Sequence, residues 1–363
     1  MNPNARGAAN GAALFFGVIT EEYPRNRRLR QFLARELAMD SVVLPVDDDP
    51  GYLRKGFGLL RRALRSPRGT YGLVVVPEFA LKYAPIAWLV AKYQGAPLLV
   101  DWFVGLYETR VGDWGREPNL RAKAGLLLDK AAARLASILV TDTQVRAAML
   151  KLEYGAKDAA VALPVGAPDW ARPQERPRSD SLEILYYGSY QPLHGLDAFI
   201  DALAKVPDKS RINLTLIGSG NTRPAVERSL VRLGLIQHCS FIDAVPEAEL
   251  GSYIAAADVV LGIFGDSKKA SSVIANKVWQ GLACNRVVLT RSNPALSELR
   301  EIAGPLLVEV DSVPAVTGLI EKWLQSPDSL RSVTVPDIDA GLESYVQSKY
   351  ELLRLELLRN GLS

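Results

Sequence analysis

Small and polar side chains in the second half of the chain have the spacing that an anion-binding site requires. The stretch Tyr186–Asp197 (YYGSYQPLHGLD) follows an apolar run typical of a strand and opens a helical pattern. Gly188 permits close backbone approach, Ser189 is a small donor, and Gly195 releases the chain into the helix. Free N–H groups at a helix start favour an anion, because their partial charges add to the helix dipole. An ordinary strand–loop–helix junction is the alternative explanation of this stretch.

A second junction, Leu216–Glu227 (LIGSGNTRPAVE), has a similar form. Ser219 lies between two glycines, and Pro224 suits the first turn of a helix. The junction lacks the full G-x-G-x-x-G spacing and the acidic partner of a nicotinamide-binding fingerprint. It therefore gives little support to dinucleotide binding.

A third junction, Leu261–Thr290, has a polar loop before its helix. The loop contains Asp266, Ser267, Lys268, Lys269, Ser271 and Ser272. Asn276 is predicted as the N-cap of the helix, and Lys277 falls in the first turn, where a cation opposes the helix dipole. A diphosphate bound at the same place would remove that conflict. A solvated lysine near a helix start is the alternative.

Short apolar runs alternate with longer helical patterns from end to end, which predicts α/β domains with parallel sheets and right-handed crossovers. Continuous apolar runs are typical of strands that are buried on both faces. The expected strands are Ala13–Val18, Ser41–Pro45, Gly72–Val76, Pro97–Asp101, Ser137–Thr141, Ala160–Pro164, Glu183–Tyr187, Asn213–Ile217, Ser240–Ile242, Val259–Ile263 and Val287–Thr290. The main expected helices are Arg27–Leu37, Leu81–Tyr93, Pro118–Leu135, Leu196–Ala204, Arg223–Leu233, Glu247–Ala256 and Asn276–Ala283.

A proline-rich, charged stretch over residues 168–180 interrupts the alternation and is predicted to be a linker. The sequence thus predicts a Rossmann-like domain over residues 1–172 and a second over 180–335. Residues 336–363 are expected to form a helix that returns to the first domain. Rossmann-type sheets bind ligands at the carboxyl ends of their strands, so a cleft between the two domains is the expected site.

Composition narrows the chemistry that the 363 residues could perform. Two cysteines, Cys239 and Cys284, and two histidines, His194 and His238, leave almost no material for a metal site or a Ser-His-Asp triad. No metal or other cofactor is therefore expected. A polar N-terminus without a signal peptide, and the absence of an uninterrupted apolar span, indicate a soluble protein of the reducing cytoplasm.

Charge is unevenly divided between the two halves. Residues 1–172 carry 24 Lys and Arg against 17 Asp and Glu, a net charge of +7, whereas the remainder has −4. Six cations and no acid lie in Arg54–Arg68, where Phe57, Leu60 and Leu64 are predicted to share one helical face. Binding to an anionic membrane is one interpretation, and an ordinary helix packed on the sheet is the other. Nucleic acid is not expected as a partner, because no binding motif accompanies these cations.

The second half resembles the donor-binding domain of GT-B fold glycosyltransferases, in particular the large retaining family four. Its "G-S/T-x-x-P-L-x-G" loop is matched by Gly188–Gly195, and its "G-x-G-x-x-R" turn is approximated by Gly218–Arg223. A related subset has an "F-G-x-S-x-K-A … I-P-N-K-V" segment, which Phe264–Val278 matches. In the first half, Tyr23–Arg27 and Asp101–Thr109 resemble the subset more loosely. The resemblance covers roughly residues 12–310.

The resemblance implies which residues bind a nucleoside-diphosphate sugar. Donor-binding residues would be Gly188, Ser189, His194, Ser219, Val245, Ser267, Ser271, Ser272, Asn276 and Gln280, with Lys269 and Lys277 meeting the diphosphate. Ser272 and Gln280 stand where the wider family has two glutamates, and His194 and Ser189 replace its loop lysine and arginine. Gln280 retains the ability to hydrogen-bond a ribose hydroxyl.

The first half supplies carboxylates at the expected strand ends but no histidine. The candidates are Glu78, Asp101, Glu108, Asp113 and Asp142, of which Asp101 and Asp142 are selected as catalytic residues. Structural carboxylates are the alternative. The lack of a histidine base agrees with the retaining chemistry that the resemblance implies, in which the donor phosphate takes the acceptor proton.

The sequence therefore predicts a hexosyl-type glycosyltransferase that acts on a glycan, lipid-linked or small-molecule acceptor, in polysaccharide or glycoconjugate biosynthesis. A peripheral contact with the inner membrane face would suit a lipid-linked acceptor. Because both family glutamates are replaced, a non-catalytic GT-B subunit that scaffolds or activates a partner is the alternative. An epimerase of the same fold is disfavoured, because such enzymes need carboxylate and histidine residues that these loops lack.

Overall fold

The computed structural model describes residues 11–46 and 51–362, which form two compact units. Unit 1 comprises residues up to Val165 together with residues from Val346 to the C-terminus, and unit 2 comprises Gly166–Tyr345. The chain enters unit 2 before residue 172, so the proline-rich stretch 168–180 belongs to unit 2. It contains no helix or strand.

Unit 1 contains a six-stranded parallel sheet with the strand order β2-β1-β3-β4-β5-β6. The strands are β1 (Ala12–Val18), β2 (Ser41–Pro45), β3 (Tyr71–Val76), β4 (Leu98–Asp101), β5 (Ile138–Thr141) and β6 (Val161–Ala162). Every side chain from Leu73 to Val76 is fully buried, as expected for a strand with helices on both faces.

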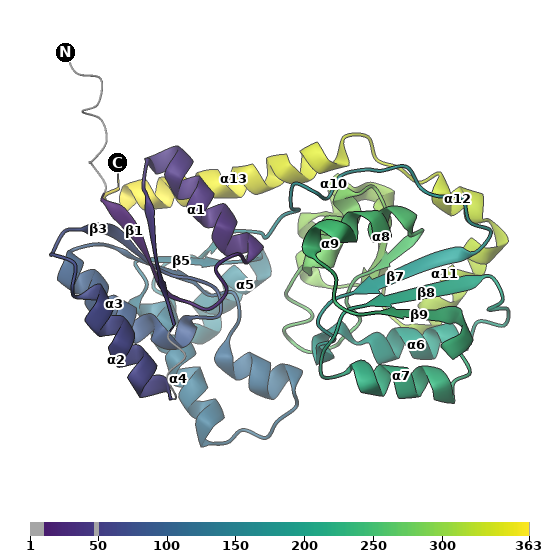
Figure 1. The fold of residues 1–363 in the computed structure, drawn as a ribbon, viewed down its shortest axis with the longest axis horizontal. Coiled ribbons are helices and arrows are strands. Elements are labelled where there is room, and N and C mark those ends of the chain that lie inside the picture. Colours follow the sequence, from purple (N-terminus) through teal and green to yellow (C-terminus); the bar gives the residue numbers. More distant parts are fainter. Residues whose placement is uncertain (1–10, 47–50, 363) are drawn as a thin grey trace, which may run out of the picture. The chain divides into compact units, whose positions relative to one another are not determined.

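The helices of unit 1 lie on two faces of this sheet. They are α1 (Pro24–Leu37), α2 (Tyr52–Ala63), α3 (Ala84–Gln94), α4 (Leu120–Leu135) and α5 (Gln144–Met149), with short turns at Leu81–Tyr83, Glu108–Asp113 and Leu150–Tyr154. Right-handed crossovers place α1 on one face and α2, α3 and α4 on the other (Figure 1). The long helix α13 (Ile338–Arg359) joins unit 1 from Val346 onward, where the Tyr350 ring contacts the Phe32 ring of α1 at a centroid distance of 4.9 Å.

Unit 2 repeats the architecture with a second six-stranded parallel sheet, in the order β12-β11-β10-β7-β8-β9. The strands are β7 (Leu182–Tyr187), β8 (Ile212–Ile217), β9 (Cys239–Ile242), β10 (Val259–Leu261), β11 (Val287–Arg291) and β12 (Leu307–Val310). The two parallel sheets confirm the predicted fold class.

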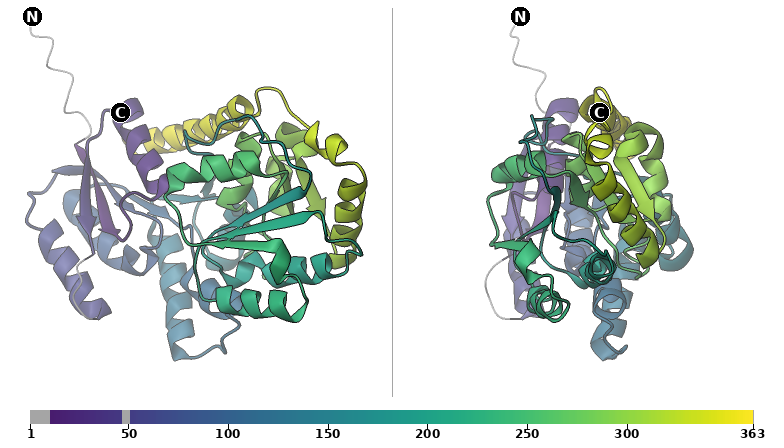
Figure 2. Two further views of the ribbon diagram at one scale, coloured as in Figure 1. Left: turned by 45° about the vertical axis from the view of Figure 1, so that its right-hand side comes forward. Right: turned by 90° about the vertical axis from the view of Figure 1, so that its right-hand side faces the viewer.

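Helices again cover both faces of the unit 2 sheet. They are α6 (Leu196–Ala204), α7 (Arg223–Arg232), α8 (Leu250–Ala256), α9 (Asn276–Ala283), α10 (Arg300–Ala303), α11 (Val313–Gln325) and α12 (Pro327–Arg331). Single helical turns occupy Pro192–His194, Ile236–His238, Glu247–Glu249, Pro294–Glu298 and Gly304–Leu306. Helices α6 and α7 lie side by side on one face, as Figures 1 and 2 show from different sides.

Two features of unit 2 differ from the sequence expectations. Strand β12 and helix α11 were not predicted, because LVEV is too short and too mixed to separate from a loop by pattern. Asn276 is not the N-cap of α9, because it already has helical geometry, and extended Ala275 precedes the helix instead. No side chain caps this end of α9, and only the Val278 N–H of its first turn donates within the described residues, to the Ala275 carbonyl at 2.9 Å, so the N–H groups of Asn276 and Lys277 are left for a ligand or water.

Candidate functional site

Three loops meet at the carboxyl ends of β7, β8 and β10 in unit 2. The backbone of the first loop lies directly against the backbone of both other loops. Gly218 has φ +116°, and a Cβ there would lie 2.1 Å from the Gly188 carbonyl oxygen. A Cβ on Gly195 would lie 2.3 Å from the Gly265 nitrogen. Glycine is therefore required at both positions, and the loops hold one another in place.

Lys277 is the buried cation of this site. Its side chain lies in the first turn of α9 with 5% of its surface exposed. The ammonium lies 4.2 Å from the centre of the Tyr186 ring, and a Cβ on Gly188 would lie 3.3 Å from it. Among residues 11–46 and 51–362 it has no hydrogen-bond partner, and burial lowers its pKa to about 7. An anion bound against Gly188 would supply the missing acceptor.

His194 is held as a neutral hydrogen-bond donor. Its Nδ1 accepts from the backbone N–H of Gln191 at 3.3 Å, and a backbone N–H has only the donor role. The Tyr186 hydroxyl therefore donates to the same nitrogen, at 2.7 Å, which leaves the proton on Nε2. Burial, with Lys277 and Lys269 nearby, lowers the pKa of His194 to about 2. His194 thus offers an N–H but no charge.

Gln280 lies one turn further along α9 and is also buried. Its Oε1 accepts a hydrogen bond from the Tyr187 hydroxyl at 2.7 Å, so that oxygen is already engaged within unit 2. The amide N–H groups are the part of this side chain that remains for a ribose hydroxyl. The spacing of the motif predicted Gln280, but it gave no sign of Tyr187.

The serines of the third loop bond mainly within the loop. Ser267 Oγ accepts from the Ala270 N–H at 3.1 Å, and the hydroxyls of Ser271 and Ser272 donate to the carbonyls of Lys268 and Lys269. Ser272 is buried. These contacts fold residues 267–272 into tight turns and place the serines as shaping residues of the loop.

A pocket of about 280 Å³ opens beside this cluster. It is lined by Tyr187, Gly188, Ser189, Ile217, Gly218, Ser219, Ala244, Val245 and Leu250. Four predicted residues are thus brought together here, with apolar walls from β8 and the loop after β9. The apolar walls suit the faces of a flat ring, and the backbone groups of the loops can bind polar atoms at its edges.

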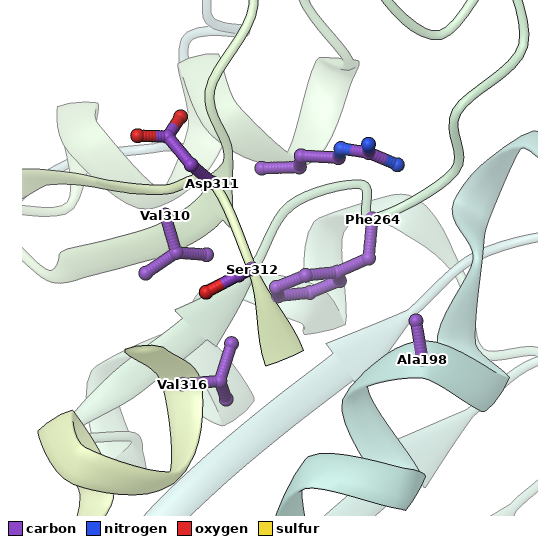
Figure 3. A pocket seen from close by; sticks show the side chains of 7 residues that line it. Ala198, Phe264, Val310, Asp311, Ser312 and Val316 are labelled. Atoms are coloured by element: carbon purple, nitrogen blue, oxygen red, sulfur yellow. The ribbon is translucent and has the colours of Figure 1, made fainter. Parts of the chain in front are cut away.

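A second, smaller pocket of about 140 Å³ lies where β11 and β12 end (Figure 3). Figure 3 shows the Phe264, Val316 and Ala198 side chains on its apolar side and Asp311 at its polar side. None of the predicted site residues lines it. Phe264 nevertheless connects it to the first site, because its N–H donates to the His194 carbonyl at 2.8 Å.

In unit 1, the selected carboxylates are already paired with cations. Asp101 receives two hydrogen bonds from Arg25, at 2.5 and 3.0 Å, and both side chains are buried. Asp142 lies 3.1 Å from the Arg146 Nε, and Arg146 also binds Glu108 at 2.6 Å. These pairs connect β4 and β5 to the helices of unit 1, which gives both aspartates a structural role.

Glu78 differs from these paired carboxylates. It follows β3, is buried, and its Oε2 has no hydrogen-bond partner among the described residues. Burial, together with the negative charge of Asp101, raises its pKa to about 8. The surroundings of Glu78 therefore favour its protonated form. Sequence reasoning placed it at a strand end but had no means of separating it from the paired carboxylates.

No membrane-spanning helix and no metal-binding group occur in the described part of the chain. None of its helices is long and apolar enough to cross a bilayer. Within residues 11–46 and 51–362, His, Cys, Asp and Glu side chains form no group of three that could hold a metal ion.

Comparison with known proteins gives a family match for unit 2 and a fold match for the whole chain. Residues 169–333 match the family model "Glycosyl transferases group 1", which covers most of unit 2. The chain is similar in structure to sucrose-phosphate synthase from Thermosynechococcus elongatus, with a TM-score of 0.70 at 15% identity, covering 97% of this chain and 98% of that chain. A search of the curated proteins found no match.

Two further solved structures have the same architecture. Anabaena Alr3699/HepE in complex with UDP-glucose aligns with a TM-score of 0.68 at 14% identity, covering 94% of this chain and 99% of that one. The lipopolysaccharide outer core galactosyltransferase WaaB aligns at 0.60 and 11% identity, covering 97% and 100%. The chain therefore has the GT-B fold, and its unit 2 matches the group 1 glycosyl transferases.

Proposed function

We propose that the protein is a glycosyltransferase that binds a nucleoside-diphosphate sugar in unit 2 and transfers the sugar to an acceptor hydroxyl. The observation that carries the proposal is Lys277, a buried ammonium that lacks an acceptor and faces the Gly188 turn. The group 1 match and the UDP-containing relatives support a nucleotide sugar as the ligand.

The chemistry assigned to the site is stabilisation of a leaving diphosphate. The bond between the anomeric carbon and the diphosphate oxygen breaks, and the acceptor oxygen bonds to that carbon. Lys277, the His194 Nε2–H and the first two N–H groups of α9 would stabilise the developing negative charge. We assign Lys269, in the third loop, to the same diphosphate. In this proposal the nucleobase occupies the pocket beside Val245.

We further propose that a hexosyl group is transferred with retention, the acceptor proton passing to a donor phosphate oxygen. The ion pairs of Asp101 and Asp142 support this, because Arg25 binds both carboxylate oxygens of Asp101 and Arg146 lies 3.1 Å from the Asp142 Oδ1. We propose that lysines, and not a metal ion, balance the phosphate charge, so excess EDTA should leave turnover unchanged. We propose that the enzyme acts in polysaccharide or glycoconjugate synthesis in the cytoplasm. Its acceptor would be a glycan, a lipid-linked sugar or a small molecule, at or near the inner membrane face.

The test compares binding of UDP, GDP and dTDP by calorimetry in the wild-type chain, Lys277→Met and Lys205→Met. Lys205 lies at the opposite end of α6 from the loops and serves as the matched control. We expect one diphosphate to bind, Lys277→Met to weaken it about 100-fold, which corresponds to about 2.7 kcal/mol, and Lys205→Met to bind normally. No binding of any diphosphate would contradict the proposal.

A non-catalytic GT-B subunit is the second candidate, and it is favoured by Ser272 and Gln280 at the two glutamate positions. The wild-type chain is incubated with a panel of nucleotide sugars, and free sugar, nucleotide and glycosylated products are measured by mass spectrometry. Turnover supports the enzyme. Binding without turnover, or a stable protein complex without nucleotide binding, supports the scaffold.

A further inference from the structure

Helices α2, α3 and α4 form one surface of unit 1, which we call the basic face. The three helices follow one another across the same side of the sheet (Figure 1). They are closely packed: a Cβ on Gly56 of α2 would lie 2.5 Å from the Ile86 side chain beside it on α3. The basic face is therefore a continuous surface and not three separate helices.

Within residues 51–100 and 120–135, all of which the structure describes, this surface exposes no carboxylate. Glu78 is the single acid between Gly51 and Val100, and it is buried. The one acid of α4, Asp129, is also fully buried, where it accepts hydrogen bonds from the N–H groups of Leu106 and Tyr107. Cations are frequent over the same segments: Arg54, Lys55, Arg61, Arg62, Arg65, Arg68, Lys82 and Lys92, followed by Arg121, Lys123, Lys130 and Arg134.

Large apolar side chains project from the basic face between these cations. On α2, Leu53 is 81% and Phe57 is 68% exposed, and they lie one turn apart. On the neighbouring helices, Leu89 is 50% and Leu127 is 69% exposed. The alternative in which Phe57 and Leu64 pack on the sheet does not hold, because Phe57 is exposed and Leu64 is 41% exposed. The helix packs through Gly56, Leu59 and Ala63 and leaves a second apolar stripe outside.

Exposed apolar side chains among cations favour a membrane over a polyanion as the partner of the basic face. Exposed Leu and Phe flanked by Arg and Lys, without acids, are the composition of helices that lie in the interface of an anionic bilayer. A polyanion such as nucleic acid would satisfy the cations but would leave Leu53 and Phe57 in water. In the described residues, Arg54, Lys55 and Arg61 have no carboxylate partner, so their charges are free to attract lipid phosphates.

We propose that the basic face docks on a bilayer that contains anionic lipid, with Leu53 and Phe57 entering the boundary between headgroups and acyl chains. The inference goes beyond the proposed glycosyl transfer and rests on unit 1 alone. Asp47, Asp48 and Asp49 precede α2 in the sequence and lie outside the described residues, so the test uses the full chain.

The test is co-sedimentation of the full chain with vesicles of phosphatidylcholine alone or with about 30% phosphatidylglycerol. We expect binding to the mixed vesicles at least tenfold stronger than to phosphatidylcholine vesicles. The double variant Leu53→Ser, Phe57→Ser should bind the mixed vesicles at least tenfold more weakly than the wild type. The triple variant Arg54→Gln, Lys55→Gln, Arg61→Gln should show the same loss. The matched controls are Leu152→Ser and Val231→Ser, at residues 84% and 61% exposed outside the basic face, which should bind as the wild type does.

Three outcomes would overturn the proposal. The first is equal binding to vesicles with and without anionic lipid. The second is wild-type affinity in the double apolar variant. The third is binding of DNA or polyglutamate that is as strong as vesicle binding and is unchanged in the apolar variants. The substituted side chains are exposed, so circular dichroism and thermal melting should be unchanged. UDP binding is measured on the same samples, so failure at the membrane and failure of the proposed function are distinguished.

Discussion

The ammonium of Lys277 lies 4.2 Å from the centre of the Tyr186 ring, and the hydroxyl of that same tyrosine holds His194. One aromatic side chain thus contacts two of the groups that are assigned to the diphosphate. The ring face stabilises the buried cation, and the hydroxyl selects the protonated nitrogen of the histidine. The first three predictions concern Lys277, His194 and this tyrosine.

Diphosphate binding should weaken as the pH rises above 7. Burial lowers the pKa of Lys277 to about 7, so the free protein loses this charge above that pH, whereas a bound diphosphate favours the charged form. Each pH unit well above the pKa should lower the affinity by a factor of about ten. Because pH 7 lies at the pKa itself, the dissociation constant should rise only about fivefold between pH 7 and 8. Calorimetry in two buffers of different ionisation enthalpy should also show proton uptake.

The ligand-free protein should show the opposite trend in stability. The pKa of Lys277 is about 7 when folded and 10.5 in the reference state, so the unfolded chain binds more protons between these values. The contribution of Lys277 to the free energy of unfolding therefore increases with pH in that window, by at most about 1.4 kcal/mol per unit. The difference between wild type and Lys277→Met in urea unfolding should show this slope. A difference that does not vary with pH would show that the pKa of Lys277 is not lowered in the folded protein.

His194 should carry its proton on Nε2 and should not titrate between pH 5 and 8. Its pKa is lowered to about 2, and two donors occupy Nδ1. The ¹⁵N shifts of the imidazole report the tautomer directly. Tyr186→Phe removes one donor and should weaken diphosphate binding about fivefold, about 1 kcal/mol. His194→Gln, which keeps an N–H donor, should bind better than His194→Ala. A protonated Nδ1 would refute the assignment.

Gly218→Ala should be severely destabilising. The new Cβ would lie 2.1 Å from the Gly188 oxygen in a backbone with φ +116°. Strain of this kind should cost about 3–5 kcal/mol or prevent folding of unit 2. Gly318→Ala in α11 is the control, since nothing lies within 4 Å of its Cβ, and it should stabilise by up to about 1 kcal/mol. Thermal melting of both variants provides the comparison, and equal melting temperatures would be inconsistent with this packing.

Asp101→Asn should reduce stability more than it reduces diphosphate binding. The change leaves the buried Arg25 guanidinium without its carboxylate, which should cost about 3–5 kcal/mol. Glu351→Gln breaks the exposed pair with Arg354 and should leave stability nearly unchanged, because water screens this pair. Urea unfolding and UDP calorimetry are measured on both. A stable Asp101→Asn protein that binds UDP but has lost turnover would instead make Asp101 catalytic.

Local patterns in the sequence predicted the two sheets and the three loops, because strand ends and helix starts depend on neighbouring residues. The side chains that bind the predicted residues could not be predicted from the sequence. Arg25 and Asp101 are far apart in the sequence, and nothing around Gln280 indicates that Tyr187 binds it. The N-cap at Asn276 failed by one residue, the usual precision of a helix boundary. The sequence left open whether Phe57 packs on the sheet, because α2 has one apolar stripe that is buried and a second that is exposed.

The division of unit 1 into two segments of the chain has a consequence for the order of synthesis. Residues 11–46 and 51–165 of unit 1 leave the ribosome first, but the helix segment from Val346 follows only after all of unit 2. Val346, Tyr350, Leu353 and Leu357 are buried, so the early segment waits with its α13-binding surface uncovered. Nascent chains arrested before Val346 should therefore recruit chaperones, and expression of residues 1–165 alone should give a protein prone to aggregate.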